Sequence, residues 1–258
     1  MKIIVLMKQV AKKDAILRIN REEKWIEESD LSYEVNESDG YALEEALRLK
    51  EKKGGEVVVC SMGPQRVKSV IKDALARGAD RAVHVVGERL EHLGPFAAAR
   101  VLAEAIREEQ ADLVMSGLQS DDYGYAQTGV ILAELMGLPH ATIVIEVDAS
   151  GEEFRVKREL ESGWYQWYTM PTPALLTIQS GINPIRYASL KGIMAAKKKE
   201  IREVQPSAEA VNEGGGSQSI TRVYFPQKTK QTQFLGDGDA KKGAAQLAEK
   251  LRSEARIF

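Results

Sequence analysis

The chain has 258 residues, of which 43% are hydrophobic and 29% charged, and its formal net charge is -2. This balance is typical of a globular protein, and it provides no basic field for nucleic acid. A single cysteine, Cys60, excludes an internal disulfide and a cysteine-based zinc site. No run reaches the roughly 18 apolar residues of a membrane span. We therefore expect a cytoplasmic protein with no membrane insertion and no nucleic-acid partner.

Strands and helices alternate along the first half of the chain. The continuously apolar run 3–7 predicts a buried first strand. In the polar stretch that follows, 16–19 and 24–26 fit a small hairpin. Further strands are indicated at 57–60, 81–86, 113–115 and 142–147, and helices at 41–49, 67–77, 95–108 and 126–136. Because short loops separate these segments, they predict parallel crossovers and a doubly wound α/β sheet.

The pattern changes after residue 148. A turn at 148–153 between two β-rich runs predicts an antiparallel hairpin added to the sheet, and 174–178 predicts another strand. From residue 197 the chain is polar and contains three consecutive glycines, which indicates an extended arm. The arm ends in an amphipathic helix with its apolar residues on one face: Ala244, Leu247, Ala248 and Leu251. We expect a domain at 1–196 and an arm at 197–258, whose helix packs either on another chain or back on its own domain.

Four segments near the ends of predicted strands have residues suited to a nucleotide. In an open parallel sheet, ligands bind beyond the carboxyl ends of the strands. The four segments are Lys8-Gln9-Val10, the pair Asn36 and Asp39, Ser61-Met62-Gly63-Pro64, and the loop 117–129. The cluster 36–39 is also rich in residues that cap helix N-termini.

The loop 117–129 is the most informative of the four. It has a glycine at each end and leads into a helix, so the first turn at Gln127, Thr128 and Gly129 can receive a phosphate. Asp122 would repel phosphate and is expected to bind ribose hydroxyls or cap the helix. The loop matches neither a P-loop nor a dinucleotide fingerprint, and a plain capped loop remains an alternative.

Taken in order, these segments resemble the beta subunit of electron-transferring flavoproteins over nearly the full chain. The resemblance begins at the first strand and its exit, and continues through the cluster 36–39 and the loop 117–129. Its most specific stretches are RELESG at 158–163, PTPALLT at 171–177 and NPIRYASLKGIM at 183–194.

The resemblance implies a flavodoxin-like domain whose C-terminal arm embraces an alpha subunit. It implies a heterodimer with FAD at the interface, held mainly by alpha, and AMP within beta. Such a subunit is an electron carrier without turnover of its own, since the redox chemistry belongs to the cofactor. By this resemblance the nucleotide is lined by Met7, Lys8, Asn36, Asp39, Ser61, Met62, Asp122, Gln127, Thr128 and Gly129.

The segment 183–194 resembles the recognition loop of the family. The resemblance implies that Tyr187, Leu190, Ile193 and Met194 dock on partner proteins, with Leu190 as the apolar anchor. Those partners would be flavin-dependent dehydrogenases that deliver electrons and a quinone oxidoreductase or similar acceptor that removes them.

The resemblance leaves three questions open. In the bifurcating branch of the family a second FAD replaces AMP and oxidises NADH. The ending Gln127-Thr128-Gly129 is nearer to the AMP-binding members, whereas Tyr123 and Tyr125 depart from both, and their rings either stack on a base or cover the loop. The aromatic run 164–168 either packs on the alpha subunit or is an adaptation to a different partner or flavin environment. A module that binds adenine nucleotides without any alpha subunit is the alternative outside the family.

Overall fold

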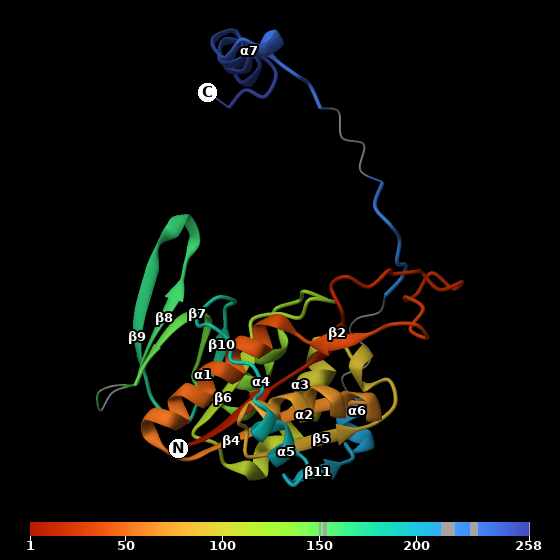
Figure 1. Cartoon of the computed structure of the whole chain (residues 1–258), viewed down its shortest axis with the longest axis vertical. Coiled ribbons are helices and arrows are strands. Elements are labelled where there is room, and N and C mark those ends of the chain that lie inside the picture. The colour runs from red at the N-terminus through yellow and green to blue at the C-terminus, as the bar shows by residue number, and fades with distance from the viewer. Residues whose placement is uncertain (150, 152–153, 213–219, 228–231, 258) are drawn as a thin grey trace. The chain divides into compact units, whose positions relative to one another are not determined.

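The computed structural model describes residues 1–149, 151, 154–212, 220–227 and 232–257. The chain divides into two compact units, Met1–Thr221 and Arg222–Phe258. Within the described residues, the first unit is built on a nine-stranded sheet with the order β11-β5-β4-β1-β6-β10-β7-β8-β9 (Figure 1). Among the described residues, no helix is both long enough and apolar enough to cross a membrane.

The sheet is parallel except at one edge. β7 pairs antiparallel with β8, which is the hairpin predicted from the sequence, and β9 in turn pairs antiparallel with β8. A separate antiparallel pair is formed by β2 and β3. The fold class predicted from the sequence, a mainly parallel doubly wound sheet with an antiparallel hairpin, is therefore confirmed. The strands are β1 (Lys2–Leu6), β2 (Gln9–Ala11), β3 (Tyr33–Val35), β4 (Glu56–Gly63), β5 (Arg81–Val86), β6 (Leu113–Gly117), β7 (His140–Asp148), β8 (Phe154–Glu159), β9 (Tyr165–Met170), β10 (Ala174–Ile178) and β11 (Ile201–Val204).

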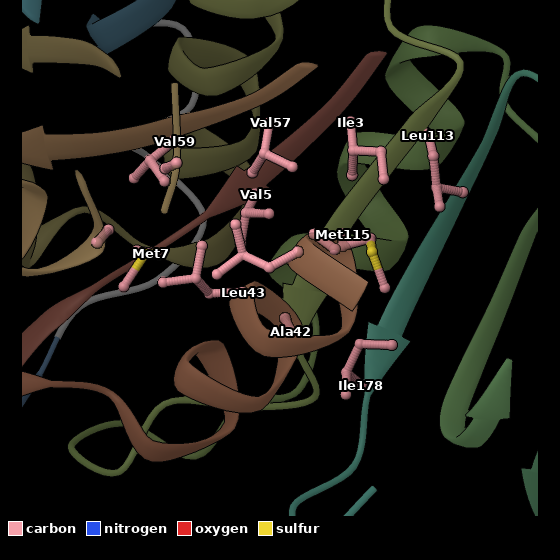
Figure 2. Close-up of a cluster of buried hydrophobic side chains, with 14 of the residues drawn as sticks. Ile3, Val5, Met7, Ala42, Leu43, Val57, Val59, Leu113, Met115 and Ile178 are labelled. Atoms are coloured by element: carbon pink, nitrogen blue, oxygen red, sulfur yellow. The ribbon is translucent and has the colours of Figure 1, made fainter. Parts of the chain in front are cut away.

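Helices cover both faces of this sheet. α1 and α2 pack on the face that carries Ile3 and Val5, and α3 and α4 pack on the face that carries Ile4 and Leu6. Figure 2 shows Leu43 of α1 close to the side chains of the first face. Since β1 is buried on both sides, its sequence is continuously apolar. The helices of the first unit are α1 (Glu37–Lys53), α2 (Lys68–Arg77), α3 (Pro95–Ile106), α4 (Thr128–Met136), α5 (Leu190–Ala196) and α6 (Ala208–Asn212), with short 3-10 turns at η1 (Gln65–Val67), η2 (Leu90–His92), η3 (Arg107–Glu109) and η4 (Glu161–Gly163).

The first unit extends further along the chain than the boundary at 196 that the sequence suggested. β11 pairs in parallel with β5 at the sheet edge, and Arg202 of β11 donates to Glu109 at 2.9 Å. A four-residue strand among charged residues has too few positions to show a periodic pattern, which is why the sequence indicated an arm there. The triple glycine of the expected arm lies outside the described residues.

The second unit contains the expected terminal helix. It consists of η5 (Gly236–Gly238) followed by α7 (Ala240–Ser253). The Asp239 carboxylate caps α7 by accepting the backbone N–H groups of Lys241 and Lys242 at 2.8 and 3.1 Å. Because capping satisfies N–H groups that the helix cannot, it fixes where the helix begins.

Candidate functional site

A pocket lies at the point where the sheet reverses its direction of winding. β1 has β4 on one side and β6 on the other, and the connections to these two neighbours run over opposite faces. A crevice therefore lies beyond the carboxyl ends of β1, β4 and β6. Ligands usually bind at this position in such a sheet. Of the residues predicted from the sequence, the following line the pocket: Met7, Lys8, Asn36, Asp39, Met62, Gln127, Thr128 and Gly129.

Ser61 and Asp122 are not among the lining residues. The buried Ser61 hydroxyl donates to the carbonyl of Met7 at 2.6 Å and so holds the end of β1 against β4. Asp122 forms an ion pair with Lys8, whose Nζ lies 2.7 and 2.8 Å from its two carboxylate oxygens. Both side chains therefore act on residues of the pocket wall. The role expected for Asp122, binding ribose hydroxyls or capping the helix, stays a prediction.

Asn36 stands at the N-cap position of α1, yet its side chain does not cap the helix as expected. Its amide nitrogen donates to the carbonyl of Gln119 at 2.9 Å, and its amide oxygen accepts the backbone N–H of Asp121 at 2.8 Å. Asn36 thus attaches the loop 117–129 to the start of α1. The sequence could not reveal this role, because the loop follows Asn36 by more than 80 residues.

Asp39 connects two of the three strands at the pocket. Its carboxylate accepts the backbone N–H of Lys8, just after β1, at 2.7 Å, and that of Gly117, at the end of β6, at 2.8 Å. A side chain at position 117 is excluded, because a Cβ there would lie 2.1 Å from Ser38 Oγ and 2.5 Å from Asp39 Oδ1. Gly117 is therefore needed for the close approach of α1 to β6.

The environment of Asp39 changes its acidity. Burial raises its pKa from 3.8 to about 7, while the hydrogen bonds from the backbone of Lys8 and Gly117 act in the opposite direction. Burial dominates because it penalises the charged form more than two hydrogen bonds favour it. The carboxyl group that joins the two strands therefore changes its charge near neutral pH.

The N-terminus of α4 borders the pocket. The helix begins at Thr128, two residues later than predicted, because Ala126 has a left-handed backbone with φ of 54°. Gly129 allows the first turn to lie close to the sheet, since a Cβ there would be 2.7 Å from Thr177 Cγ2 and 2.9 Å from Ser116 Oγ. The free N–H groups and the dipole of a helix N-terminus favour an anion.

Sequence reasoning missed an apolar wall of the same pocket. It is lined by Leu93, which follows η2, and by Pro95, Ala98 and Leu102 of α3. These residues follow β5, and a Gly-Pro pair at the start of a helix after a strand was the available signal. With a helix N-terminus on one side and an apolar wall on the other, the residues fit a nucleotide, which has a phosphate and a planar base.

The segment 183–194 lies against α1 and α2, away from this pocket. Arg186 Nε donates to the buried Glu44 of α1 at 2.8 Å, and Asn183 Nδ2 donates to Glu45 at 3.0 Å. Ser189 caps α5 by accepting the N–H of Gly192 at 3.0 Å. The four residues expected to dock on partners are exposed on this anchored segment: Tyr187 (96%), Leu190 (84%), Met194 (63%) and Ile193 (44%).

Comparison with known proteins agrees with this geometry. The model of the electron transfer flavoprotein domain matches residues 24–209, which is well over half of the chain. The chain is 39% identical to the electron transfer flavoprotein subunit beta of Methylophilus methylotrophus, with 92% of this chain and 93% of the relative covered. It is 35% identical to that of Bradyrhizobium diazoefficiens, with both chains fully covered. It is 34% identical to that of Homo sapiens, with 89% of this chain and 91% of the relative covered.

The chain therefore belongs to the electron transfer flavoprotein family. The relatives named above are all beta subunits, and they align with the chain over most or all of their length. The resemblance inferred from the sequence is confirmed at this level.

Proposed function

We propose that this chain is the beta subunit of a heterodimeric, cytoplasmic electron carrier that binds AMP in the pocket at the ends of β1, β4 and β6. In this proposal the alpha subunit holds most of an FAD at the interface. When bound, the flavin accepts and releases the electrons, and this chain contributes binding and positioning. The observation that carries the proposal is the convergence of Lys8, Met62 and the first turn of α4 on one pocket in a member of this family.

The shape and charge of the pocket support a mononucleotide. The α4 N-terminus at Thr128 and Gly129 suits a phosphate. The apolar residues Leu93 and Pro95 suit the faces of a base. Asn36 and Asp39 use their polar atoms on the backbone of the pocket wall, so we assign them the role of holding the pocket in shape.

We further propose that the segment 183–194 docks on electron donors and acceptors, namely flavin-dependent dehydrogenases and a quinone oxidoreductase or similar acceptor. Exposed apolar side chains on a rigid support are suited to this role, because little order has to be gained on binding. The support here is the hydrogen-bonded base formed by Arg186, Asn183 and the carboxylates of α1. Leu190, the first residue of α5, is the proposed anchor.

The test is the nucleotide content of the complex. The full chain would be expressed with an alpha subunit, purified, denatured, and the released FAD and AMP quantified. One FAD and one AMP per heterodimer is the expected result.

Two other results would contradict the proposal in distinguishable ways. Two FAD and no AMP would identify a bifurcating protein, in which a second FAD oxidises NADH. A chain that forms no complex with alpha and binds adenine nucleotides alone would be an independent nucleotide-binding module.

A further inference from the structure

Three aromatic rings from two separate segments form a column beside the pocket. Trp25 stacks on Tyr123 with ring centroids 5.1 Å apart and an interplanar angle of 23°. Tyr123 in turn stacks on Tyr125 at 5.4 Å and 19°. Stacked geometries of this kind are favourable between aromatic side chains. We call these three residues the aromatic column.

Two rings of the aromatic column border two cavities. Tyr123 and Tyr125 line the pocket at the strand ends, and the same two residues line a second cavity together with Trp25, Arg89 and His92. The first cavity has a volume of about 120 Å³ and the second about 520 Å³. The larger space therefore lies on the far side of the column, as seen from the α4 N-terminus.

Contacts on several sides hold the column in place. The Trp25 indole N–H donates to Glu28 at 2.8 Å, and the rings of Trp25 and His92 form a T-shaped pair with centroids 5.1 Å apart. Lys8 Nζ lies 4.4 Å from the centroid of Tyr123 while it is paired with Asp122. Removal from water raises the pKa of Tyr123 above its ordinary value, as expected for a ring packed between others.

The backbone around Tyr125 supports the same arrangement. Gly124 and Ala126, on either side of it, have left-handed backbones with φ of 64° and 54°. Such a conformation is unfavourable for alanine, so the loop is held in it by its surroundings. Tyr125 is the most exposed ring of the column, with 36% of its surface accessible, and it is therefore the ring whose removal least disturbs the fold.

We propose that the aromatic column is a specificity wall that ends the nucleotide pocket after one nucleotide. In this proposal a nucleoside monophosphate binds on the α4 side, and the second half of a dinucleotide would meet the rings of Tyr123 and Tyr125. Loss of these rings joins the two cavities and admits a dinucleotide. This inference rests on the proposed nucleotide site and names the residues that decide which ligand class the site accepts.

The test measures ligand selectivity in the complete complex, with the interface flavin bound and the co-purified AMP removed before the titration. AMP and additional FAD are titrated by calorimetry into the wild type, Tyr125→Ala, and the double variant Tyr123→Ala/Tyr125→Ala. We expect the affinity for the added FAD to rise by at least about 10-fold in the double variant, while the AMP affinity changes by less than about 3-fold. Tyr125→Phe, which keeps the ring, should behave like the wild type.

Each remaining result has a defined meaning. Loss of AMP binding without any gain for FAD would overturn the inference and make the column a platform on which the base stacks. Unchanged affinities for both ligands would overturn it as well. If the double variant does not fold, Tyr125→Ala carries the test with the same expected direction. Failure of the wild type to bind AMP would refute the proposed function, which is a separate result.

Discussion

The replacement Asp39→Asn tests the connection between β1 and β6. In the native chain the two carboxylate oxygens accept the N–H groups of Lys8 and Gly117. Asparagine has nearly the same shape but only one oxygen, so one of these buried N–H groups would face an NH2 group instead. An unsatisfied buried donor costs about 1–3 kcal/mol of the free energy of unfolding.

The effect of Asp39→Asn on stability should depend on pH. The pKa of Asp39 is about 7 in the folded chain and close to 3.8 in the unfolded chain. The unfolded chain therefore releases this proton first, and the stability contributed by Asp39 falls as the pH rises from about 4 to about 7. Between pH 5.5 and pH 8 the wild type loses roughly 2 kcal/mol through this group, at about 1.4 kcal/mol per pH unit below the folded pKa. The variant has no carboxyl group at this position and loses nothing there.

We therefore expect the destabilisation caused by Asp39→Asn to be larger at pH 5.5 than at pH 8, by roughly 2 kcal/mol. Urea unfolding of the full-length chain at both pH values, compared with the wild type, measures the difference. Ser38→Ala is the matched control, because it removes the hydrogen bond from Ser38 Oγ to Gln119 and no titrating group. If the cost of Asp39→Asn were the same at both pH values, the burial argument for its raised pKa would be refuted.

Three further predictions concern other parts of the chain. Leu190→Ala should slow electron transfer from a partner dehydrogenase at least about 10-fold, with FAD and AMP content unchanged. The control is Ile16→Ala, which truncates another exposed apolar side chain. Equal rates for the two variants would remove Leu190 from the docking site. Arg186→Gln should lower the free energy of unfolding by about 1–3 kcal/mol, because Glu44 loses a guanidinium partner at 2.8 Å. If urea unfolding gave the same free energy for the variant and the wild type, the Arg186–Glu44 pair would not stabilise the chain. Cys60, whose pKa burial raises to about 12, should react with a thiol reagent at pH 8 only after unfolding, and rapid native labelling would contradict that burial.

Local sequence patterns were sufficient to predict the layers of the fold. Continuous apolar runs such as residues 3–7 correspond to strands with helices on both faces, and the predicted run 81–86 coincides with β5. Short edge elements such as β11 were not predicted, because their pairing depends on a neighbour that is far away in the sequence. The aromatic β9 pairs with β8 through register contacts that no local period encodes.

In the candidate site, too, some features follow from the local sequence and others only from the tertiary structure. The sequence by itself determined that polar residues follow the strands and that a glycine-bounded loop precedes a helix, because these are properties of neighbouring residues. Only the tertiary structure decided that Asp39 connects β1 to β6, that Lys8 pairs with Asp122, and that Trp25 stacks on Tyr123. The physical reason is that a hydrogen bond or a ring contact between distant segments depends on where the whole sheet places them.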